Sequence, residues 1–241
     1  MKILLAGATG VIGRRLVPLL VEAGHDVTGT TRSADKKVML ERLGAAAVVV
    51  DVLDAALLAA VVNEAKPEVI IHQLTDLPDT LDPAAMAEVL ARTARVRVAG
   101  TRNLMDALRA TGTRRVIAQS LAFVYAPGSE PHREEDALDT RPDAAVTVEG
   151  VLSLERAVTG TAAIAGIVLR YGRLYGPGTW SDTPTPPPAL HVDAAAQAAV
   201  LAITRGAPGI YNIAEDDGAV SIAKAQAQLG FDPAFRAAHS A

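Results

Sequence analysis

The stretch LLAGATGVIGRRL, residues 4–16, decides the fold that this sequence predicts. An apolar run typical of a buried strand leads into three glycines at a spacing of three residues, and a helix begins as the stretch ends. In this setting Gly7 permits a tight turn, Gly10 lets the backbone approach a pyrophosphate, and Gly13 lets the helix pack close to the strand. The helix N-terminus adds free N–H groups and a favourable dipole. The loop therefore predicts a dinucleotide site, the alternative being a tight turn without a ligand.

Strand-like and helical patterns alternate along the rest of the chain. Strands are expected at residues 2–6, 25–31, 46–51, 68–74 and 114–120, within 163–176, and at 209–214. Helices are expected at residues 11–23, 34–43, 54–65, 83–111, 149–159, 193–204 and 221–229. This order requires parallel strands joined by right-handed crossovers, with helices on both faces. The predicted fold class is a Rossmann-type doubly wound α/β sheet. Residues 1–176 form the dinucleotide-binding core, and residues 177–241 form a reduced substrate-side lobe packed on the same domain.

Composition narrows the classes of function. The 241 residues carry a net charge of −4 without a long basic run, and only 3% are aromatic, which argues against nucleic acid as a partner. No apolar run reaches the roughly 18 residues that span a bilayer, and a signal-peptide pattern is missing, so we expect a cytoplasmic protein that does not bind membranes. The chain has no cysteine and five scattered histidines, so a metal site is not expected.

Further motifs follow the glycine loop along almost the whole chain. They are VVVDVLD (48–54), VIIHQLT (69–75), VAGTRNLMDAL (98–108), LRYGRLYGPG (169–178), LHVDAAAQAAVLAI (190–203), GIYNIA (209–214) and AQAQLGFDP (225–233). This ordered set resembles the short-chain dehydrogenase/reductase superfamily, in particular its extended branch of sugar-nucleotide epimerases and dehydratases. The resemblance implies an NAD(P)-dependent oxidoreductase or epimerase-like enzyme. It also implies a homodimer through the fourth and fifth helices of the fold.

The resemblance and the residues together predict how a cofactor is held. By resemblance, Asp51 would hydrogen-bond adenine, Val52 would pack beside the ring, and the fourth-strand motif would line the nicotinamide side. The second strand ends without the acidic residue that usually binds the ribose of NAD, and Arg32 follows it, so NADP(H) is favoured over NAD(H) unless Arg32 is only a solvated charge. The expected cofactor-binding residues are Gly7, Thr9, Gly10, Val11, Ile12, Gly13, Arg32, Asp51, Val52, Gln73 and Leu74.

The catalytic pair of the resembled family is missing. Its members carry Tyr-x-x-x-Lys on the fifth helix, where the lysine lowers the tyrosine pKa and the tyrosine moves a proton to or from the substrate oxygen. Aligning Glu155 with the glutamate that often follows this lysine puts Val151 and Thr147 at the two positions, and no tyrosine of the sequence has a lysine four residues later. The chain is therefore expected to use a non-standard proton donor. The alternatives are an NADP(H)-sensing regulator or pseudoenzyme and a non-redox use of the fold.

Few residues are candidates to replace the missing tyrosine and lysine. Ser120 lies one residue from the strand position of the catalytic serine, and Tyr171 lies at the carboxyl end of the sixth strand, where open α/β sheets bind ligands. Both are catalytic candidates. The candidate substrate contacts are Tyr125, Arg173 and Tyr175, and Arg173 stands where relatives often place a substrate-contacting asparagine, which indicates an anionic group.

The region that would cover the substrate is short. Only 12 residues separate Gly178 from His191, and three of them form the run Pro186–Pro188. Extended relatives usually have longer insertions there. We therefore expect a small-molecule substrate in place of a nucleotide sugar.

Overall fold

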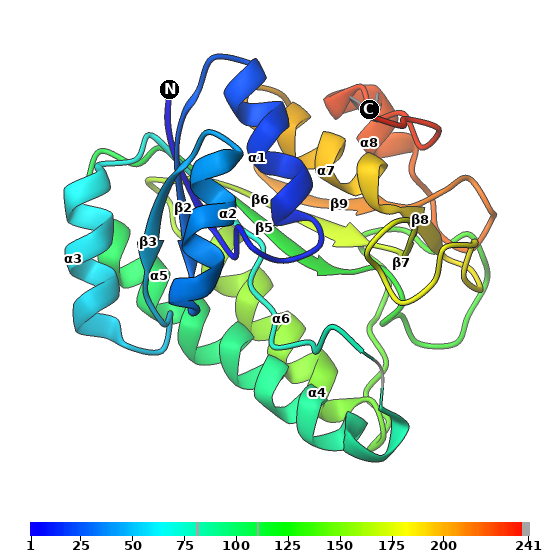
Figure 1. Ribbon diagram of the computed structural model, residues 1–241. Helices are drawn as coiled ribbons and strands as arrows, with labels where there is room; N and C mark the ends of the chain where they lie inside the picture. The colour runs from blue at the N-terminus through cyan, green and yellow to red at the C-terminus, as the bar shows by residue number, and fades with distance from the viewer. Residues whose placement is uncertain (81, 110, 238–241) are drawn as a thin grey trace.

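The structure, a computed structural model, describes residues 1–80, 82–109 and 111–237. Its centre is a seven-stranded parallel sheet in the order β3-β2-β1-β4-β5-β6-β9 (Figure 1). The strands are β1 (Lys2–Ala6), β2 (Asp26–Thr31), β3 (Ala46–Val49), β4 (Val69–His72), β5 (Arg115–Leu121), β6 (Ala165–Tyr171) and β9 (Gly209–Ile213). The strand order reverses between β1 and β4, and ligands of open α/β sheets bind at the carboxyl edge beside such a reversal. The predicted Rossmann-type fold is confirmed.

Helices cover both faces of this sheet (Figure 1). They are α1 (Gly13–Glu22), α2 (Lys37–Arg42), α3 (Ala55–Ala65), α4 (Met86–Arg95), α5 (Thr101–Leu108), α6 (Ala145–Thr159), α7 (Val192–Leu201) and α8 (Ala223–Leu229). The 3-10 turns Ala34–Lys36 and Pro83–Ala85 lead into α2 and α4. A π-helical segment, Val96–Gly100, joins α4 to α5.

The side chains of β1 show how the sheet divides the core. Ile3 and Leu5 pack with α1, α2, α7 and α8 on one face. Leu4 and Ala6 pack with α3, α5 and α6 on the other. This apolar character on both faces is typical of a central parallel strand. The two layers hold the carboxyl ends of β1, β4, β5 and β6 in fixed positions.

Three elements differ from the predicted pattern. The helix expected at 83–111 runs from Pro83 to Leu108 but contains the π-helical segment, and its residue 110 lies outside the described residues. The helix expected at 149–159 begins earlier, at Ala145. The run 163–176 divides into β6 and a separate strand β7 (Arg173–Tyr175), which pairs with β8 (Ala189–His191) in a small second sheet. Parallel pairing with a strand so distant in sequence leaves no local signal.

The segment after residue 176 contributes to the main sheet. Its strand β9 pairs with β6 in parallel, and α7 and α8 cover the face that carries α1. The Arg115 side chain on β5 donates hydrogen bonds to the carbonyl oxygens of Ala202 and Gly206, at 2.7 and 2.8 Å. The C-terminal residues therefore complete the sheet, and β7, β8 and the proline-rich loop between them lie beyond its carboxyl edge.

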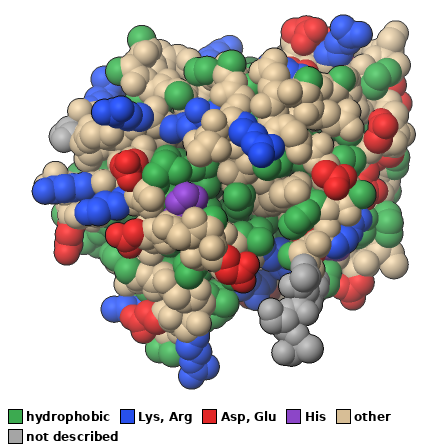
Figure 2. All heavy atoms as spheres, turned by 90° about the horizontal axis from the view of Figure 1, so that it is seen from above, with side chains coloured by type: hydrophobic (Ala, Val, Ile, Leu, Met, Phe, Trp, Pro, Cys, Tyr) green, Lys and Arg blue, Asp and Glu red, His purple; other side chains and the backbone are tan. Residues whose placement is uncertain are grey.

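On the face seen in Figure 2, acidic and basic side chains are interspersed. Across the described residues, no helix is both long enough and apolar enough to cross a membrane. The same residues contain no cluster of three or more His, Asp or Glu side chains that could hold a metal ion.

Candidate functional site

The glycine loop has the backbone shape that the sequence predicts. Gly7 follows β1 with φ +86°, and a Cβ on it would lie 2.7 Å from the Gln73 carbonyl oxygen. A Cβ on Gly13 would lie 2.4 Å from the Gly7 carbonyl oxygen. Gly10 is exposed, so its backbone is open to a ligand at the N-terminus of α1. The loop thus leaves the close backbone approach that a pyrophosphate needs.

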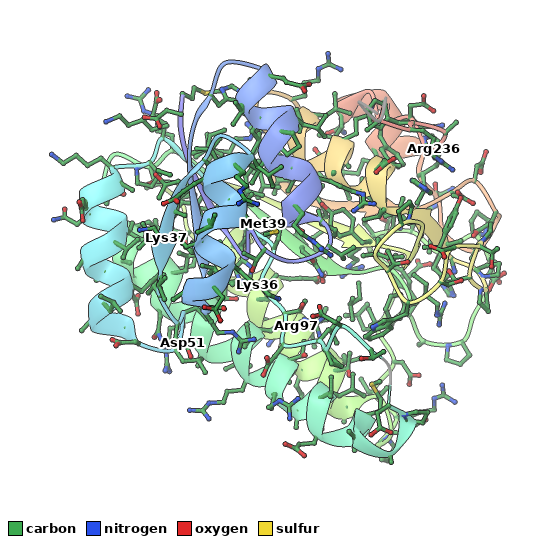
Figure 3. The ribbon with its side chains drawn as sticks, in the orientation of Figure 1. Lys36, Lys37, Met39, Asp51, Arg97 and Arg236 are labelled. Carbon is green, nitrogen blue, oxygen red and sulfur yellow. The ribbon has the colours of Figure 1, made fainter. Side chains whose placement is uncertain are left out.

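A cleft opens beside this loop at the carboxyl ends of β1–β4. Its lining includes eight of the residues expected to bind a cofactor, namely Gly7, Thr9, Gly10, Arg32, Asp51, Val52, Gln73 and Leu74. Val11 and Gly13 lie at the loop beside it, and Ile12 packs into the core. The lining also includes Lys36 and Val96. No sequence motif marks Val96 as a cleft residue. Lys36 and Asp51 lie on the same side of the molecule in Figure 3.

Polar groups in the cleft suit a dinucleotide. The Gly7 N–H donates to Thr30 Oγ1 at 3.3 Å, so the end of β2 supports the loop. Gln73 Nε2 donates to the Tyr171 hydroxyl at 3.4 Å, while Gln73 Oε1 is buried without a hydrogen-bond partner among the described residues. A buried acceptor left without a donor is costly. It fits a ligand that brings an amide N–H, as a nicotinamide carboxamide does.

Arg32 lies at the β2 end of the cleft and is held by an acidic residue. Its Nη2 is 2.6 Å from Asp76 Oδ1, and Arg92 Nε on α4 lies 3.1 Å from the other oxygen of the same carboxylate. Partial burial acts to raise the pKa of Asp76, but the two arginines outweigh it and lower that pKa. Asp76 therefore stays charged at neutral pH and steers the exposed Arg32 side chain toward the cleft.

The positions of the missing catalytic pair face the same sheet edge from α6. Val151 is fully buried and packs with Val124 and Val148, and Thr147 is half-buried. Neither residue brings a charge or an acidic hydroxyl to the site. The α6 helix therefore offers no phenol–ammonium pair at this edge.

Ser120, a predicted catalytic residue, is part of a buried ion-pair network. Its hydroxyl donates to Glu155 Oε1 at 2.8 Å. Arg170 on β6 donates to both oxygens of the same carboxylate, at 2.8 and 2.7 Å. Burial opposes the charge of Arg170, yet Glu155 and Tyr125 raise its pKa above the usual value. Ser120 and Arg170 thus share the Glu155 carboxylate, and the Ser120 hydroxyl faces α6.

Tyr125, a predicted substrate contact, belongs to the same network. Its hydroxyl donates to Asn212 Oδ1 at 2.6 Å and accepts from Arg170 Nη1 at 2.8 Å. Burial raises the pKa of this phenol, although Arg170 opposes the shift. The ring stacks on His132, with the ring centres 5.0 Å apart. The hydroxyl is occupied on both sides, so only the ring edge is left to contact a substrate.

Tyr171 and His72 close the inner end of the site. Tyr171 is fully buried, and this burial raises the pKa of its phenol well above the usual range. The Leu74 N–H donates to His72 Nδ1 at 3.3 Å, which leaves Nε2 to donate to Thr101 Oγ1 at 2.9 Å. Burial lowers the pKa of His72 to about 4. Both side chains are therefore neutral at physiological pH.

Arg173 and Tyr175 lie on β7, beyond the sheet edge. Arg173 borders a pocket of about 440 Å³, and its guanidinium carbon lies 4.6 Å from the centre of the Phe123 ring. The Tyr175 hydroxyl donates to Glu215 and accepts from Arg236 at 3.0 Å. Arg173 thus faces the pocket, which Tyr125 also lines, whereas the Tyr175 hydroxyl is engaged by the C-terminal segment. The roles of these residues and of Ser120 and Tyr171 stay predictions.

The fold and this cleft together define a dinucleotide-binding Rossmann enzyme. The family model described as "NAD dependent epimerase/dehydratase family" matches residues 3–189. The chain belongs to this family, which confirms the resemblance seen in the sequence motifs. It is an NAD(P)-dependent oxidoreductase or epimerase, and its cofactor is a nicotinamide dinucleotide.

Two curated relatives are reductases from Streptomyces. A 3-diazoavenalumate denitrifying reductase of a Streptomyces species is 41% identical over 242 residues, which cover 91% of this chain and 77% of the relative. A dTDP-4-dehydrorhamnose reductase of Streptomyces griseus is 31% identical over 179 residues, covering 73% of this chain and 50% of the relative.

Solved structures of sugar-nucleotide epimerases share the fold. The UDP-glucose 4-epimerase of Thermotoga maritima, solved with UDP-glucose, matches with a TM-score of 0.80 at 18% identity, covering 98% of this chain and 94% of that one. The UDP-glucuronic acid 4-epimerase of Bacillus cereus, solved with NAD, matches with a TM-score of 0.75 at 17% identity, covering 98% and 94%. At these identities the likeness shows the fold alone.

Proposed function

We propose that this enzyme is a reductase that transfers hydride to a small organic substrate without a protein acid at a substrate oxygen. The observation that carries the proposal is the pair Thr147 and Val151, which leaves α6 without a tyrosine and a lysine at these positions. The hydroxyls of Ser120 and Tyr125 are held by Glu155, Asn212 and Arg170. A substrate whose reduction needs no proton suits this site better than a carbonyl compound.

An arene diazonium ion is such a substrate. Hydride forms a new C–H bond at the ring carbon, the C–N bond breaks, and its electron pair leaves with N₂. The charges balance because one cation and one hydride give neutral arene and dinitrogen. A reduced nicotinamide cofactor, when bound, would supply this hydride and become oxidised. The Streptomyces relative that is 41% identical supports this substrate class, because its name describes a reductase that denitrifies a diazo compound.

The chain's own residues would hold the reactants in this proposal. The glycine loop and the N-terminus of α1 would bind the pyrophosphate, Asp51 and Val52 would hold the adenine, and Gln73 would receive the carboxamide. The pocket of about 440 Å³ beside Phe123, Tyr125 and Arg173 takes a small aromatic substrate. Burial of His72 and Tyr171 in uncharged form keeps water and mobile protons away from the reacting carbon.

We also propose NADPH as the preferred reductant. Arg32 lines the cleft at the end of β2, with one guanidinium nitrogen on Asp76, and its other N–H groups suit a 2′-phosphate. Lys36 lines the same part of the cleft and adds a second positive charge. The cytoplasmic location and the lack of nucleic-acid and membrane partners stay predictions.

The experiment combines cofactor binding with product analysis. The protein is titrated with NADPH and NADH and then incubated with 4-carboxybenzenediazonium and reduced cofactor deuterated at C4. We expect cofactor oxidation, equimolar N₂ release and benzoate that carries deuterium at the former C–N carbon. Reactions without protein, and with a variant that does not bind cofactor, correct for direct reduction of the diazonium ion.

Other outcomes separate the competing functions. Tight NADPH binding without turnover of the diazonium ion or of a panel of aldehydes, ketones and enones would favour the NADP(H)-sensing regulator. Turnover of a carbonyl compound alone would favour an enzyme with a non-standard proton donor over a diazonium reductase. Failure to bind either dinucleotide would contradict the proposal at its first step.

A further inference from the structure

Arg97 is a largely buried cation that has no ion-pair partner among the described residues. The residue is only 4% exposed to solvent. Within the described part of the chain it takes part in no ion pair and no side-chain hydrogen bond, although Glu155 lies close enough to act on its charge. Burial lowers the pKa of Arg97 to about 10, so the guanidinium is still charged at neutral pH. An unpaired buried charge is costly, and natural proteins usually pair such groups.

Glu155 is not available as an ion-pair partner for Arg97. Arg170 donates to both of its oxygens, and Ser120 donates to one of them. One guanidinium and one hydroxyl already satisfy this carboxylate. The site therefore contains two buried arginines and a single buried carboxylate, and the second positive charge belongs to Arg97.

The backbone around Arg97 places it at the junction of the cleft and α6. It belongs to the π-helical segment Val96–Gly100, and π-helical turns occur frequently at functional sites. Its neighbour Val96 lines the cofactor cleft. A Cβ on Gly100 would lie 2.8 Å from Val52 Cγ1, so the end of the segment touches the cleft wall. In Figure 3, Arg97 lies near the middle of the molecule, well away from the C-terminal Arg236.

The position of α6 relates Arg97 to the missing lysine. A Cβ on Gly150 would lie 3.2 Å from the Ala94 Cα, so α6 and α4 approach closely there. Arg97 lies one helical turn after Ala94, while Val151 and Glu155 share one face of α6. Arg97 also acts electrostatically on His72, whose pKa is lowered mainly by burial. Arg97 thus lies in the segment that joins the β4 end of the cofactor cleft to α6, a helix without a lysine.

We propose that Arg97 binds an ionised oxygen, carboxylate or phenolate, of the substrate beside the β4 end of the cofactor cleft. The inference rests on the proposed reductase function and adds to it a recognition residue for an anionic substrate. In this arrangement the π-helical segment supplies the cation that is missing at position 151 of α6. The oxygen forms charge-assisted hydrogen bonds with the guanidinium, and these are about twice as strong as neutral ones.

This pairing also affects the reactivity of a diazonium substrate. A ring oxygen with a negative charge donates electron density toward the diazonium group and makes the ring carbon a poorer hydride acceptor. A guanidinium at that oxygen holds the charge in place and keeps the carbon electrophilic. Arg97 thus acts by binding and polarising the substrate, and it moves no proton.

The test measures binding of matched anionic and neutral probes by calorimetry, with and without NADPH. The probes are cinnamate against cinnamamide for a carboxylate, and 4-nitrophenolate against 4-nitroanisole at pH 8.5 for a phenolate. The variants are Arg97→Gln and Arg97→Lys, with Arg95→Gln as the control because Arg95 is an exposed cation two residues away. The thermal transition and the NADPH affinity of each variant are recorded.

We expect Arg97→Gln to weaken binding of at least one anion about 10-fold or more while its neutral partner binds as before. Arg97→Lys should retain part of the preference, and Arg95→Gln all of it. The stability of Arg97→Gln should be equal to or above that of the unsubstituted protein, because an unpaired charge is removed.

Three results would overturn the proposal. They are equal binding of anions and neutral partners by the unsubstituted protein, an unchanged preference in Arg97→Gln, and a large loss of stability in that variant, which would make Arg97 a structural residue. Diazonium reduction and NADPH binding are measured separately, so a failure of the reductase proposal is distinguishable from a failure of this one.

Discussion

Arg32 and Arg92 each bind one oxygen of the Asp76 carboxylate, and only Arg32 lines the cofactor cleft. We predict that Arg32→Ala raises the Kd for NADPH about 10-fold and leaves the Kd for NADH nearly unchanged, because the lost cation pairs only with the 2′-phosphate. Fluorescence titration with both dinucleotides measures the effect. Arg92→Ala is the matched control, since it also frees Asp76 but lies on α4. A preference for NADH that Arg32→Ala does not alter would contradict the choice of NADPH.

His72 makes stability depend on pH. Its pKa is lowered to about 4 by burial, whereas the unfolded chain has the ordinary value of 6.5. Between these values the unfolded state binds more protons, so stability is present above pH 6.5 and is lost as the pH falls toward 4. This group alone should remove about 2 kcal/mol of unfolding free energy between pH 7 and pH 5. Urea unfolding at both pH values measures the loss, which His72→Gln should abolish; an identical loss in the variant would refute this assignment.

The strand–loop–helix element β1–α1 is the part of the site with the least tolerance for change. We predict that Gly13→Ala disrupts NADPH binding, because its Cβ would lie 2.4 Å from the Gly7 carbonyl oxygen and the loop must shift. The Kd should rise about 10-fold or more, with a loss of stability on the order of 1–3 kcal/mol. Gly24→Ala is a control in a similar helix-end setting, where a Cβ meets nothing within 4 Å, although its φ of +78° carries some strain. Unchanged binding by Gly13→Ala would contradict the role of the loop.

At the scale of elements, local pattern predicted much of the sheet and its helices. The six strands of the alternating pattern and the strand near 209–214 all occur. They could be predicted because hydrophobic periodicity, and the glycines and prolines that end each element, are local signals. The π-helical segment and the β7–β8 pair were not predicted. A π-turn keeps the composition of an α-helix, and β7 pairs with a strand on the far side of a proline-rich loop, so neither leaves a distinctive local pattern.

At the scale of the whole molecule, α4 and α6 lie side by side on the outer surface (Figure 1). They belong to the fourth and fifth helices of the predicted pattern, residues 83–111 and 149–159. Val98 and Val146 are 42% and 50% exposed on this face. We propose that it forms the homodimer expected from the sequence, and we predict that the double variant Val98→Asp, Val146→Asp is a monomer. Sedimentation velocity measures the change. Leu57→Asp on α3, where the leucine is 45% exposed, is the control and should leave the dimer intact. A monomeric unsubstituted protein would refute the proposal.

The sequence by itself determined the class of this enzyme. A strand that leads into glycines at residues 7, 10 and 13, followed by alternating strands and helices, is sufficient for a Rossmann fold, because each signal lies within a few neighbouring residues. Most residues expected at the cofactor cleft do line it, since parallel strands bring their carboxyl ends to one edge. The absence of Tyr-x-x-x-Lys can also be read directly from the sequence.

Only the tertiary structure decided which polar side chains have hydrogen-bond or ion-pair partners. Ser120, Glu155 and Arg170 come from β5, α6 and β6, and their pairing depends on how helix and strands pack. The same packing leaves Arg97 without a partner among the described residues, although its sequence neighbours give no sign of it. Pairing between residues far apart in the chain is a property of the assembled layers, whereas secondary structure follows local periodicity. For this reason most residues of the cleft could be predicted from the sequence, whereas the burial of Arg97 without an ion-pair partner could not.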